Sequence, residues 1–342
     1  MYVLTIAGCL VAALFTALIC ANAQKIGNFA GLLDRPDSVR KLHQGSVPLI
    51  GGLAIILPVA LMAVAYLLWV TTEHTLGTAI AAMVCAAIVG VIDDSRGLSA
   101  RERLLAQAII VVMACLIEPA FQLHNIRLSL LNMQFSVDPF AILATMFIVI
   151  GFVNSANLAD GINGQLLGSV AVWSGFILIY APDERTPFLV LLSSTLVALF
   201  YNLRGKLFSG SVGSYALSLF IGMSAISLYR RSNGAFHADL PVYWFWLPVV
   251  DCLRLFSWRA LNNRSPLSAD RCHIHHVLTR LVGSKLALPI YLALLALPGI
   301  VAIFRENLGA LAVGVCLVAY FSVFGIEKAL RTPSPTLHPE NA

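Results

Sequence analysis

Long apolar runs recur along the whole chain, and they constrain its fold more than any other feature. Eleven of them are nearly free of charged residues: 2–23, 48–70, 76–92, 104–121, 138–155, 166–181, 187–201, 213–229, 240–256, 286–304 and 308–326. A helix of about 20 such residues crosses a hydrocarbon core of about 30 Å. Only 11% of the residues are charged, against about 25% in a soluble domain. We therefore expect an all-α polytopic membrane protein with about 11 transmembrane helices, 10 being the alternative count.

Basic residues indicate how these helices are oriented. The tetrapeptide "ANAQ" at 21–24 resembles a secretory cleavage site, but no Lys or Arg precedes the apolar run, as a signal peptide would require. We therefore expect an uncleaved first helix with a periplasmic N-terminus. In that orientation 17 of the 22 Lys and Arg residues fall on the inner side of the membrane, where such residues accumulate. The C-terminus is then cytoplasmic.

The rest of the chain shows little sign of further domains. Residues 1–331 read as a single transmembrane domain, and 332–342 as a Pro-rich polar tail that we expect to be disordered. The outer segment 125–137 alternates weakly and predicts a short hairpin. The seven cysteines are scattered without a C-x-x-C pair, so we expect apolar packing rather than disulfides or a zinc site. The net charge of +5 follows from the basic inner loops, and no nucleic-acid partner is expected.

Two adjacent carboxylates, Asp93 and Asp94, directly follow an apolar run. Like charges this close repel each other and favour a cation or a basic partner between them. A solvated turn that ends the helix is the alternative. The continuation "SRGLSARERLLAQ" places Arg103 and Gln107 four residues apart on one helical face. The positive charge of Arg103 suits an anionic ligand, and we interpret the loop as a binding surface.

A second polar group, "FVNSANLADGINGQLLG", occupies residues 152–168. Asn154, Asn157 and Asp160 emerge at the inner end of a predicted helix, and two glycines then let the backbone turn sharply. Asn side chains sometimes hold transmembrane helices together, which is one interpretation. The other is a set of oxygen ligands for a hard cation such as Mg²⁺, with Asn163 available to hydrogen-bond a base or a sugar.

Histidines dominate the segment 265–280, "SPLSADRCHIHHVLTR". His273 and His276 share a face if the segment is helical, whereas His275 points elsewhere. A zinc site is one alternative, but the segment offers no fourth ligand, and Arg264 and other basic neighbours would repel a cation. A structural loop is a further alternative, but we favour a diphosphate-binding cluster.

The inner segment 31–52 carries Arg40, Lys41 and His43. One interpretation is a positive-inside anchor. The other is a docking place for a lipid phosphate, which would lie at the depth of these cations.

Taken in order, these four segments resemble the polyprenyl-phosphate N-acetylhexosamine-1-phosphate transferases, or glycosyltransferase family 4. The resemblance covers residues 1 to about 326 and rests on four motifs: "DRPDSVRKLHQGSVPLIGG", "DD" with "LSARERLLAQ", "NxxNxxDGxNG" and "SPxSxDRxHIHH". The form "HIHH" is more similar to the N-acetylglucosamine branch of the family than to the peptidoglycan branch.

The resemblance implies a reaction in the bacterial inner membrane. A sugar 1-phosphate, expected to be an N-acetylhexosamine 1-phosphate, passes from a UDP-sugar to undecaprenyl phosphate, and UMP is released. The active site would lie at the cytoplasmic face and use Mg²⁺ or Mn²⁺. The product would start a cell-envelope glycan such as an O-antigen or a teichoic acid. The resemblance also allows a homodimer.

The resemblance also implies residue roles. Asp93 would activate the lipid phosphate for attack on the β-phosphorus, and Asp94 would assist in positioning. The cation would be held by Asn157 and Asp94, with position 211 as the family's further ligand. The implied substrate contacts are Asp160 and Asn163 for the nucleotide sugar, Arg264, His273, His275 and His276 for its diphosphate, and Arg103, Lys41 and His43 for anionic groups.

Two positions depart from the family pattern. Arg103 stands where the family has Lys, and a planar guanidinium is not equivalent to a point-charge ammonium. Ser211 stands where the family has the Asp that binds Mg²⁺, and a neutral hydroxyl is a poorer ligand than a carboxylate. Either Asp94 or Asp160 takes over, or the enzyme works weakly, or the chain is a catalytically silent homologue that binds polyprenyl phosphate. A proton-coupled transporter is disfavoured because the ionisable residues gather in inner loops rather than along the apolar runs.

Overall fold

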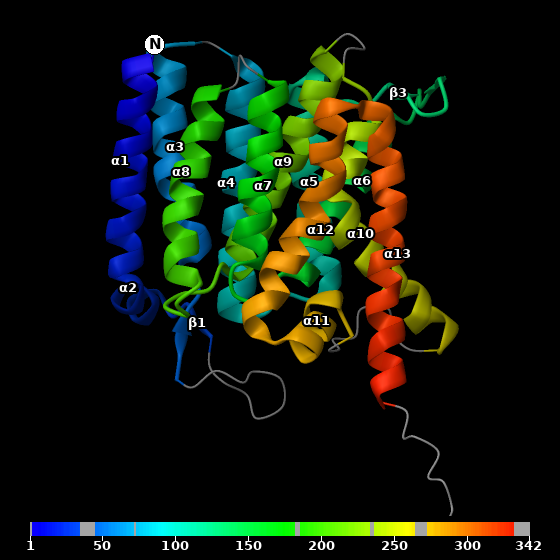
Figure 1. The fold of residues 1–342 in the computed structure, drawn as a ribbon. Coiled ribbons are helices and arrows are strands. Elements are labelled where there is room, and N and C mark those ends of the chain that lie inside the picture. Colours follow the sequence, from blue (N-terminus) through cyan, green and yellow to red (C-terminus); the bar gives the residue numbers. More distant parts are fainter. Residues whose placement is uncertain are drawn as a thin grey trace, which may run out of the picture.

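The computed structural model describes residues 2–34, 45–71, 73–181, 185–232, 236–263 and 272–331, which form a bundle of helices lying side by side (Figure 1). The helices are α1 (Tyr2–Ala21), α2 (Ala23–Ala30), α3 (Gly51–Trp69), α4 (His74–Arg96), α5 (Ala100–Ile117), the 3₁₀ turn η1 (Pro119–Phe121), α6 (Ala141–Ala159), α7 (Gln165–Tyr180), α8 (Arg185–Asn202), α9 (Gly210–Arg231), α10 (Asp239–Leu261), α11 (Ile274–Val282), α12 (Ser284–Phe304) and α13 (Glu306–Arg331). The strands are β1 (Leu33–Asp34), β2 (Val47–Pro48), β3 (Asn125–Leu128) and β4 (Met133–Ser136).

Each of the eleven predicted apolar runs coincides with one long helix, because helices satisfy their own backbone hydrogen bonds where water is absent. In the described part of the chain, seven helices are long and apolar enough to cross a membrane, namely α1, α3, α4, α6, α9, α12 and α13. The prediction of an all-α multi-pass membrane protein is confirmed. The number of crossings, their orientation and the single-domain organisation stay predictions.

The two ends of the bundle differ in what they carry. The hairpin predicted at 125–137 is confirmed as the antiparallel pair β3 and β4, in which Asn125 faces Ser136. It lies at the same end as the N-terminus, whereas β1 and α11 lie at the opposite end (Figure 1). We call these the β3 end and the α11 end. All seven cysteines are free.

Helix α9 occupies the centre of the bundle and packs closely through glycines. Nine-tenths of its apolar window is buried, and α4 is its most extensive neighbour. A β-carbon on Gly52 of α3 would lie 2.6 Å from the Cα atom of Gly213, and one on Gly90 of α4 would lie 2.5 Å from the backbone nitrogen of Val212. Small residues allow this approach between membrane helices. The start of α9 is therefore held in place by the backbones of α3 and α4.

Prolines inside two helices release carbonyl groups that tryptophans then bind. Pro248 in α10 has no N–H to donate to the carbonyl of Trp244. The indole N–H of Trp173, on α7, donates to that carbonyl at 2.9 Å. A second indole does the same for the carbonyl four residues before Pro298 in α12. These contacts satisfy buried backbone groups and tie α10 to its neighbours.

Candidate active site

Asp93 lies at the α11 end of α4 and is held on both carboxylate oxygens. The hydroxyl of Tyr215 donates to Oδ2 at 2.7 Å, and the backbone N–H of Leu98 donates to Oδ1 at 2.8 Å. The guanidinium of Arg103 lies 3.6 Å from Oδ2 and 3.4 Å from the Tyr215 hydroxyl. The predicted neighbourhood of Asp93 and Arg103 is therefore present. It includes a tyrosine that the sequence analysis did not identify.

Asp94 binds the first turn of α9. Its carboxylate accepts the backbone N–H groups of Ser211 at 2.9 Å and Val212 at 3.4 Å, and the Ser211 hydroxyl also donates to it. A carboxylate at a helix N-terminus is stabilised by the helix dipole. Gly210 adopts a left-handed φ of +67°, and a β-carbon there would overlap Asp94 Oδ2. Ser211 thus lies beside Asp94, and it acts there as a hydrogen-bond donor.

Asp160 follows the last residue of α6 and lies close to Asp94. Burial, together with the like charge of Asp94, raises the pKa of Asp160 to about 7, although the Leu166 N–H and the Ser209 hydroxyl donate to it. Such a shift, from burial and a like charge, is typical of functional carboxylates.

Asn157 completes a set of oxygen donors near the start of α9. Its side-chain oxygen accepts a 2.7 Å hydrogen bond from the Ser214 hydroxyl. No group of three or more His, Cys, Asp or Glu side chains within the described ranges is placed to hold a metal ion. Two carboxylates, Asp94 and Asp160, with one amide oxygen nevertheless form a donor set that suits a hard cation. The prediction of Mg²⁺ remains untested.

Asn154 has a structural contact, whereas Asn163 is exposed at the α11 end. The Asn154 amide donates to Gln107 on α5 at 2.7 Å, which fits the alternative of Asn as a link between membrane helices. The turn at 160–164 is held by buried Asn202, whose oxygen accepts the N–H of Gly164. Asn163 therefore projects from an anchored turn.

The histidine segment packs against this turn. His275 is only 1% exposed, and its Nδ1 lies 3.3 Å from the side-chain nitrogen of buried Gln165. Gly161 packs so closely on the ring that a β-carbon there would overlap Nε2. Burial, reinforced by the neighbouring His276 and His273, lowers the pKa of His275 well below its usual range. In this conformation His275 is a neutral packing residue, and its predicted diphosphate contact would need the segment to open.

His273 has a different environment. Its Nδ1 lies 2.7 Å from Oδ2 of Asp251 on α10. The His273 and His275 rings are parallel, with centroids 5.5 Å apart, and the centroids of the His275 and His276 rings are 4.2 Å apart. The three predicted histidines thus lie together. Lys41, His43, Arg264 and the tail 332–342 lie outside the described residues.

An apolar groove reaches this end from between α5, α6 and α10. Its volume is about 710 Å³, and Leu104, Phe152, Phe245 and Val249 are among the apolar side chains that line it. Its polar lining residues are Arg103, Asn154, Ser155, Asn157 and buried Arg259. The groove thus joins a hydrocarbon-like surface to the side chains around Asp93.

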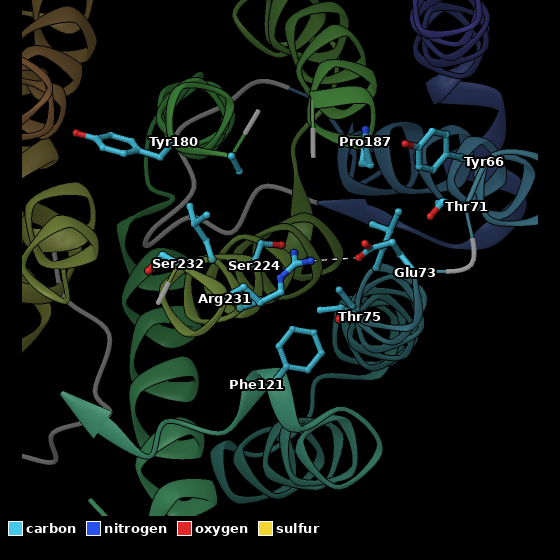
Figure 2. A pocket seen from close by; sticks show the side chains of 15 residues that line it. Tyr66, Thr71, Glu73, Thr75, Phe121, Tyr180, Pro187, Ser224, Arg231 and Ser232 are labelled. Carbon is cyan, nitrogen blue, oxygen red and sulfur yellow. Dashed lines mark hydrogen bonds and ion pairs between the residues drawn. The ribbon is translucent and has the colours of Figure 1, made fainter. Parts of the chain in front are cut away.

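A second cavity, of about 400 Å³, lies at the β3 end of α4 and α9 (Figure 2). In it Arg231 and Glu73 point toward one another and form an ion pair of 3.1 Å (Figure 2). Twenty residues of helix at roughly 1.5 Å each place this cavity about 30 Å from Asp94. It is therefore separate from the candidate site.

Sequence reasoning missed Tyr215, Gln165 and Asp251. Tyr215 lies one helical turn after Ser211, and that spacing could have identified it. Asp251 is a carboxylate inside a predicted apolar run, which by itself indicates a functional residue.

Comparison with known proteins points to the same family. The glycosyl transferase family 4 profile matches residues 75–229. An undecaprenyl-phosphate alpha-N-acetylglucosaminyl 1-phosphate transferase of Yersinia pestis is 28% identical, over 91% of this chain and 87% of its own length. The protein of the same name in Salmonella typhi is 29% identical, over 78% and 74%. A probable undecaprenyl-phosphate N-acetylglucosaminyl 1-phosphate transferase of Bacillus subtilis is 29% identical, over 78% and 75%.

The profile spans α4 to α9, which carry Asp93, Asp94, Asn157, Asp160 and Ser211. The resemblance seen in the motifs is therefore confirmed: the chain is similar to glycosyl transferase family 4 across these helices, and to phosphoglycosyl transferases over most of its length.

Proposed function

We propose that this chain transfers an N-acetylhexosamine 1-phosphate from a UDP-sugar to undecaprenyl phosphate, with release of UMP. The names of its relatives support the acceptor lipid and an N-acetylglucosaminyl 1-phosphate group. The product would start a lipid-linked cell-envelope glycan, such as an O-antigen or a teichoic acid.

The apolar groove is the observation that carries this proposal. A polyprenyl chain needs a hydrocarbon-lined path, whereas its phosphate needs cations and hydrogen-bond donors. The groove lined by Phe152, Phe245 and Val249 provides the path, and Arg103 and Arg259 at its polar part suit the phosphate. Asp93 lies 3.6 Å from the Arg103 guanidinium, so a phosphate bound there would lie near the carboxylate assigned to its activation.

The proposed chemistry is a single displacement at phosphorus. Asp93 accepts the remaining proton of the lipid phosphate, and an oxygen of that phosphate attacks the β-phosphorus of the UDP-sugar. The new P–O bond forms as the bond from the β-phosphorus to the UMP oxygen breaks. Phosphoryl transfer of this kind depends mainly on positioning and on neutralising negative charge. Arg103 would provide part of that charge, and His273 would hydrogen-bond the diphosphate.

The donor set at the start of α9 would suit a divalent cation, Mg²⁺ or Mn²⁺, which Asp94 and Asn157 would hold with Asp160 nearby. When bound, the cation would neutralise charge on the nucleotide diphosphate. Ser211 would contribute less than the family's Asp, because its hydroxyl already donates to Asp94. The α11 end would face the cytoplasm, in a bacterial inner membrane.

The test is a panel of UDP-sugars incubated with purified protein, undecaprenyl phosphate and either Mg²⁺ or Mn²⁺. We expect UMP release with at least one N-acetylhexosamine donor, and no release when the lipid phosphate is omitted. UMP release that is independent of the lipid would contradict the proposed acceptor.

A second candidate function rests on Ser211. The chain could bind polyprenyl phosphate without turnover, as a member of the family that lacks one metal ligand. Ser211→Asp would place a carboxylate against Asp94, and a divalent cation would then be needed to hold the two together. Turnover that appears only in this variant would favour the second candidate, whereas wild-type turnover would exclude it.

A further inference from the structure

We infer that Asp251 is a positioning residue that fixes the tautomer and the direction of His273 in the nucleotide-sugar site. The inference rests on the proposed function for the identity of the ligand, the diphosphate of a UDP-sugar. It concerns a carboxylate on α10, far in sequence from the aspartates of the motifs.

Asp251 is 2% exposed, and both of its oxygens accept hydrogen bonds. Oδ2 lies 2.7 Å from His273 Nδ1. Oδ1 accepts the Tyr320 hydroxyl at 2.6 Å and the Arg254 guanidinium at 3.0 Å. The backbone N–H of Ile274, the first residue of α11, lies 3.3 Å from each oxygen.

Three helices meet at this carboxylate. Arg254, on α10 like Asp251, also donates to the Cys272 carbonyl at 2.6 Å and to the hydroxyl of Tyr320, on α13, at 2.6 Å. The backbone on both sides of His273 is therefore tied to the same group of side chains. An isolated carboxylate at this depth would be costly, and these donors are what make its burial tolerable.

The contact with Asp251 determines which ring nitrogen carries the proton. An ionised carboxylate only accepts hydrogen bonds, so Nδ1 of His273 must carry the hydrogen. The opposite nitrogen, Nε2, makes no contact with Asp251. No side chain or backbone group in the described residues bonds to Nε2, and this atom is not among the fully enclosed polar atoms without partners.

A carboxylate behind one imidazole nitrogen orients the ring. Nε2 then lies on the side of the ring away from Asp251, where a ring that carries both protons donates an N–H to an anion. His275 cannot do this, because its Nε2 faces Gly161 in the protein interior. The structure thus separates the roles of two histidines that the sequence treats alike. His273 contacts the diphosphate, and His275 packs the segment against the turn at 160–164.

The test compares three variants by steady-state kinetics and by ¹⁵N NMR of histidine-labelled protein. Asp251→Asn removes the obligate acceptor, and Asp251→Glu keeps a carboxylate. Glu327→Gln is the control. Glu327, on α13, accepts a 2.6 Å hydrogen bond from Arg280 on α11, the helix that follows His273, but it does not contact His273. A loss of activity that came only from loosening α11 would appear in this control as well.

We expect Asp251→Asn to raise the KM for the UDP-sugar by about tenfold or more, with a smaller change in kcat. Asp251→Glu should recover part of that loss, and Glu327→Gln should stay within about twofold of wild type. The wild-type spectrum should contain one histidine with a strongly hydrogen-bonded Nδ1–H, and Asp251→Asn should lose it.

A wild-type KM in Asp251→Asn, or an unchanged histidine spectrum, would overturn the inference. If the wild-type protein shows no turnover, the proposed function fails and the spectrum alone decides the role of Asp251. If Asp251→Asn does not fold, Asp251→Glu bears the same prediction with a smaller effect.

Discussion

Replacing Gly52 by alanine should displace the start of α9 and impair the site. The added β-carbon would lie 2.6 Å from the Cα atom of Gly213. Ordinary van der Waals contact begins at 3.4 Å. The atom that the β-carbon would meet belongs to the backbone of Gly213, so it cannot rotate away as a side chain could. Overpacking of this kind costs about 1–3 kcal/mol. Alanine in a helix returns at most about 1 kcal/mol relative to glycine, so a net loss of stability is expected.

Gly175→Ala in α7 is the matched control, because its β-carbon would have nothing within 4 Å. We expect the melting temperature of Gly52→Ala in detergent to fall below that of wild type, and that of Gly175→Ala to stay equal or rise. Ser209, Ser211 and Val212 all sit at the displaced end of α9, so activity should fall as well, by up to about 100-fold for a shift of 1 Å. Wild-type stability and activity in Gly52→Ala would show that the contact of Gly52 with Gly213 does not position α9.

Three further perturbations test separate parts of the site. Tyr215→Phe keeps the ring but removes the 2.7 Å hydrogen bond to Asp93; because a hydrogen bond to a charged group contributes about 1.5–3 kcal/mol, kcat should fall at least tenfold in the UMP-release assay, and an unchanged kcat would exclude this contact from catalysis. His275 has a lowered pKa when folded and about 6.5 when unfolded, so its stabilising contribution is complete above pH 6.5 and is lost as the pH falls below that value, by about 1.4 kcal/mol at pH 5.5. Asp160, whose pKa is raised to about 7, changes stability in the opposite direction over this range, but it does so in both proteins. Between pH 7.5 and 5.5 the melting temperature of the wild type should therefore fall relative to that of His275→Asn; a constant difference between the two would show that another group is responsible. Val249→Trp should narrow the groove and raise the KM for undecaprenyl phosphate but not for the UDP-sugar, whereas Val64→Trp, on an exposed face of α3, should change neither; a rise for the UDP-sugar alone would place the lipid elsewhere.

Much of the fold could be predicted because the membrane restricts the choice of structure. A run of about 20 apolar residues must be helical in lipid, so all eleven runs coincide with helices. Hydropathy does not predict which helices pack against each other. The central place of α9 depends on contacts such as that of Gly52 with Gly213, which join residues far apart in sequence.

The candidate site was predictable where its residues form short motifs. Asp93 with Arg103, and Asp94 with Ser211, lie together as the motifs indicated. The support of the histidines was not predictable, because Asp251 and Tyr320 come from helices that sequence spacing does not relate. Local periodicity separated His275 from its neighbours, but it did not show that His275 is buried against Gly161.

Attack of a lipid phosphate on the β-phosphorus of a UDP-sugar can be followed with a single isotopic label. UDP-N-acetylglucosamine carrying ³²P at the β-phosphate is incubated with the protein, undecaprenyl phosphate and Mg²⁺, and the lipid and aqueous phases are counted. We expect the label to enter the lipid in equal amount to the UMP released, and Asp93→Asn to abolish both. Label recovered as UDP, or lipid labelling that persists in Asp93→Asn, would contradict this mechanism.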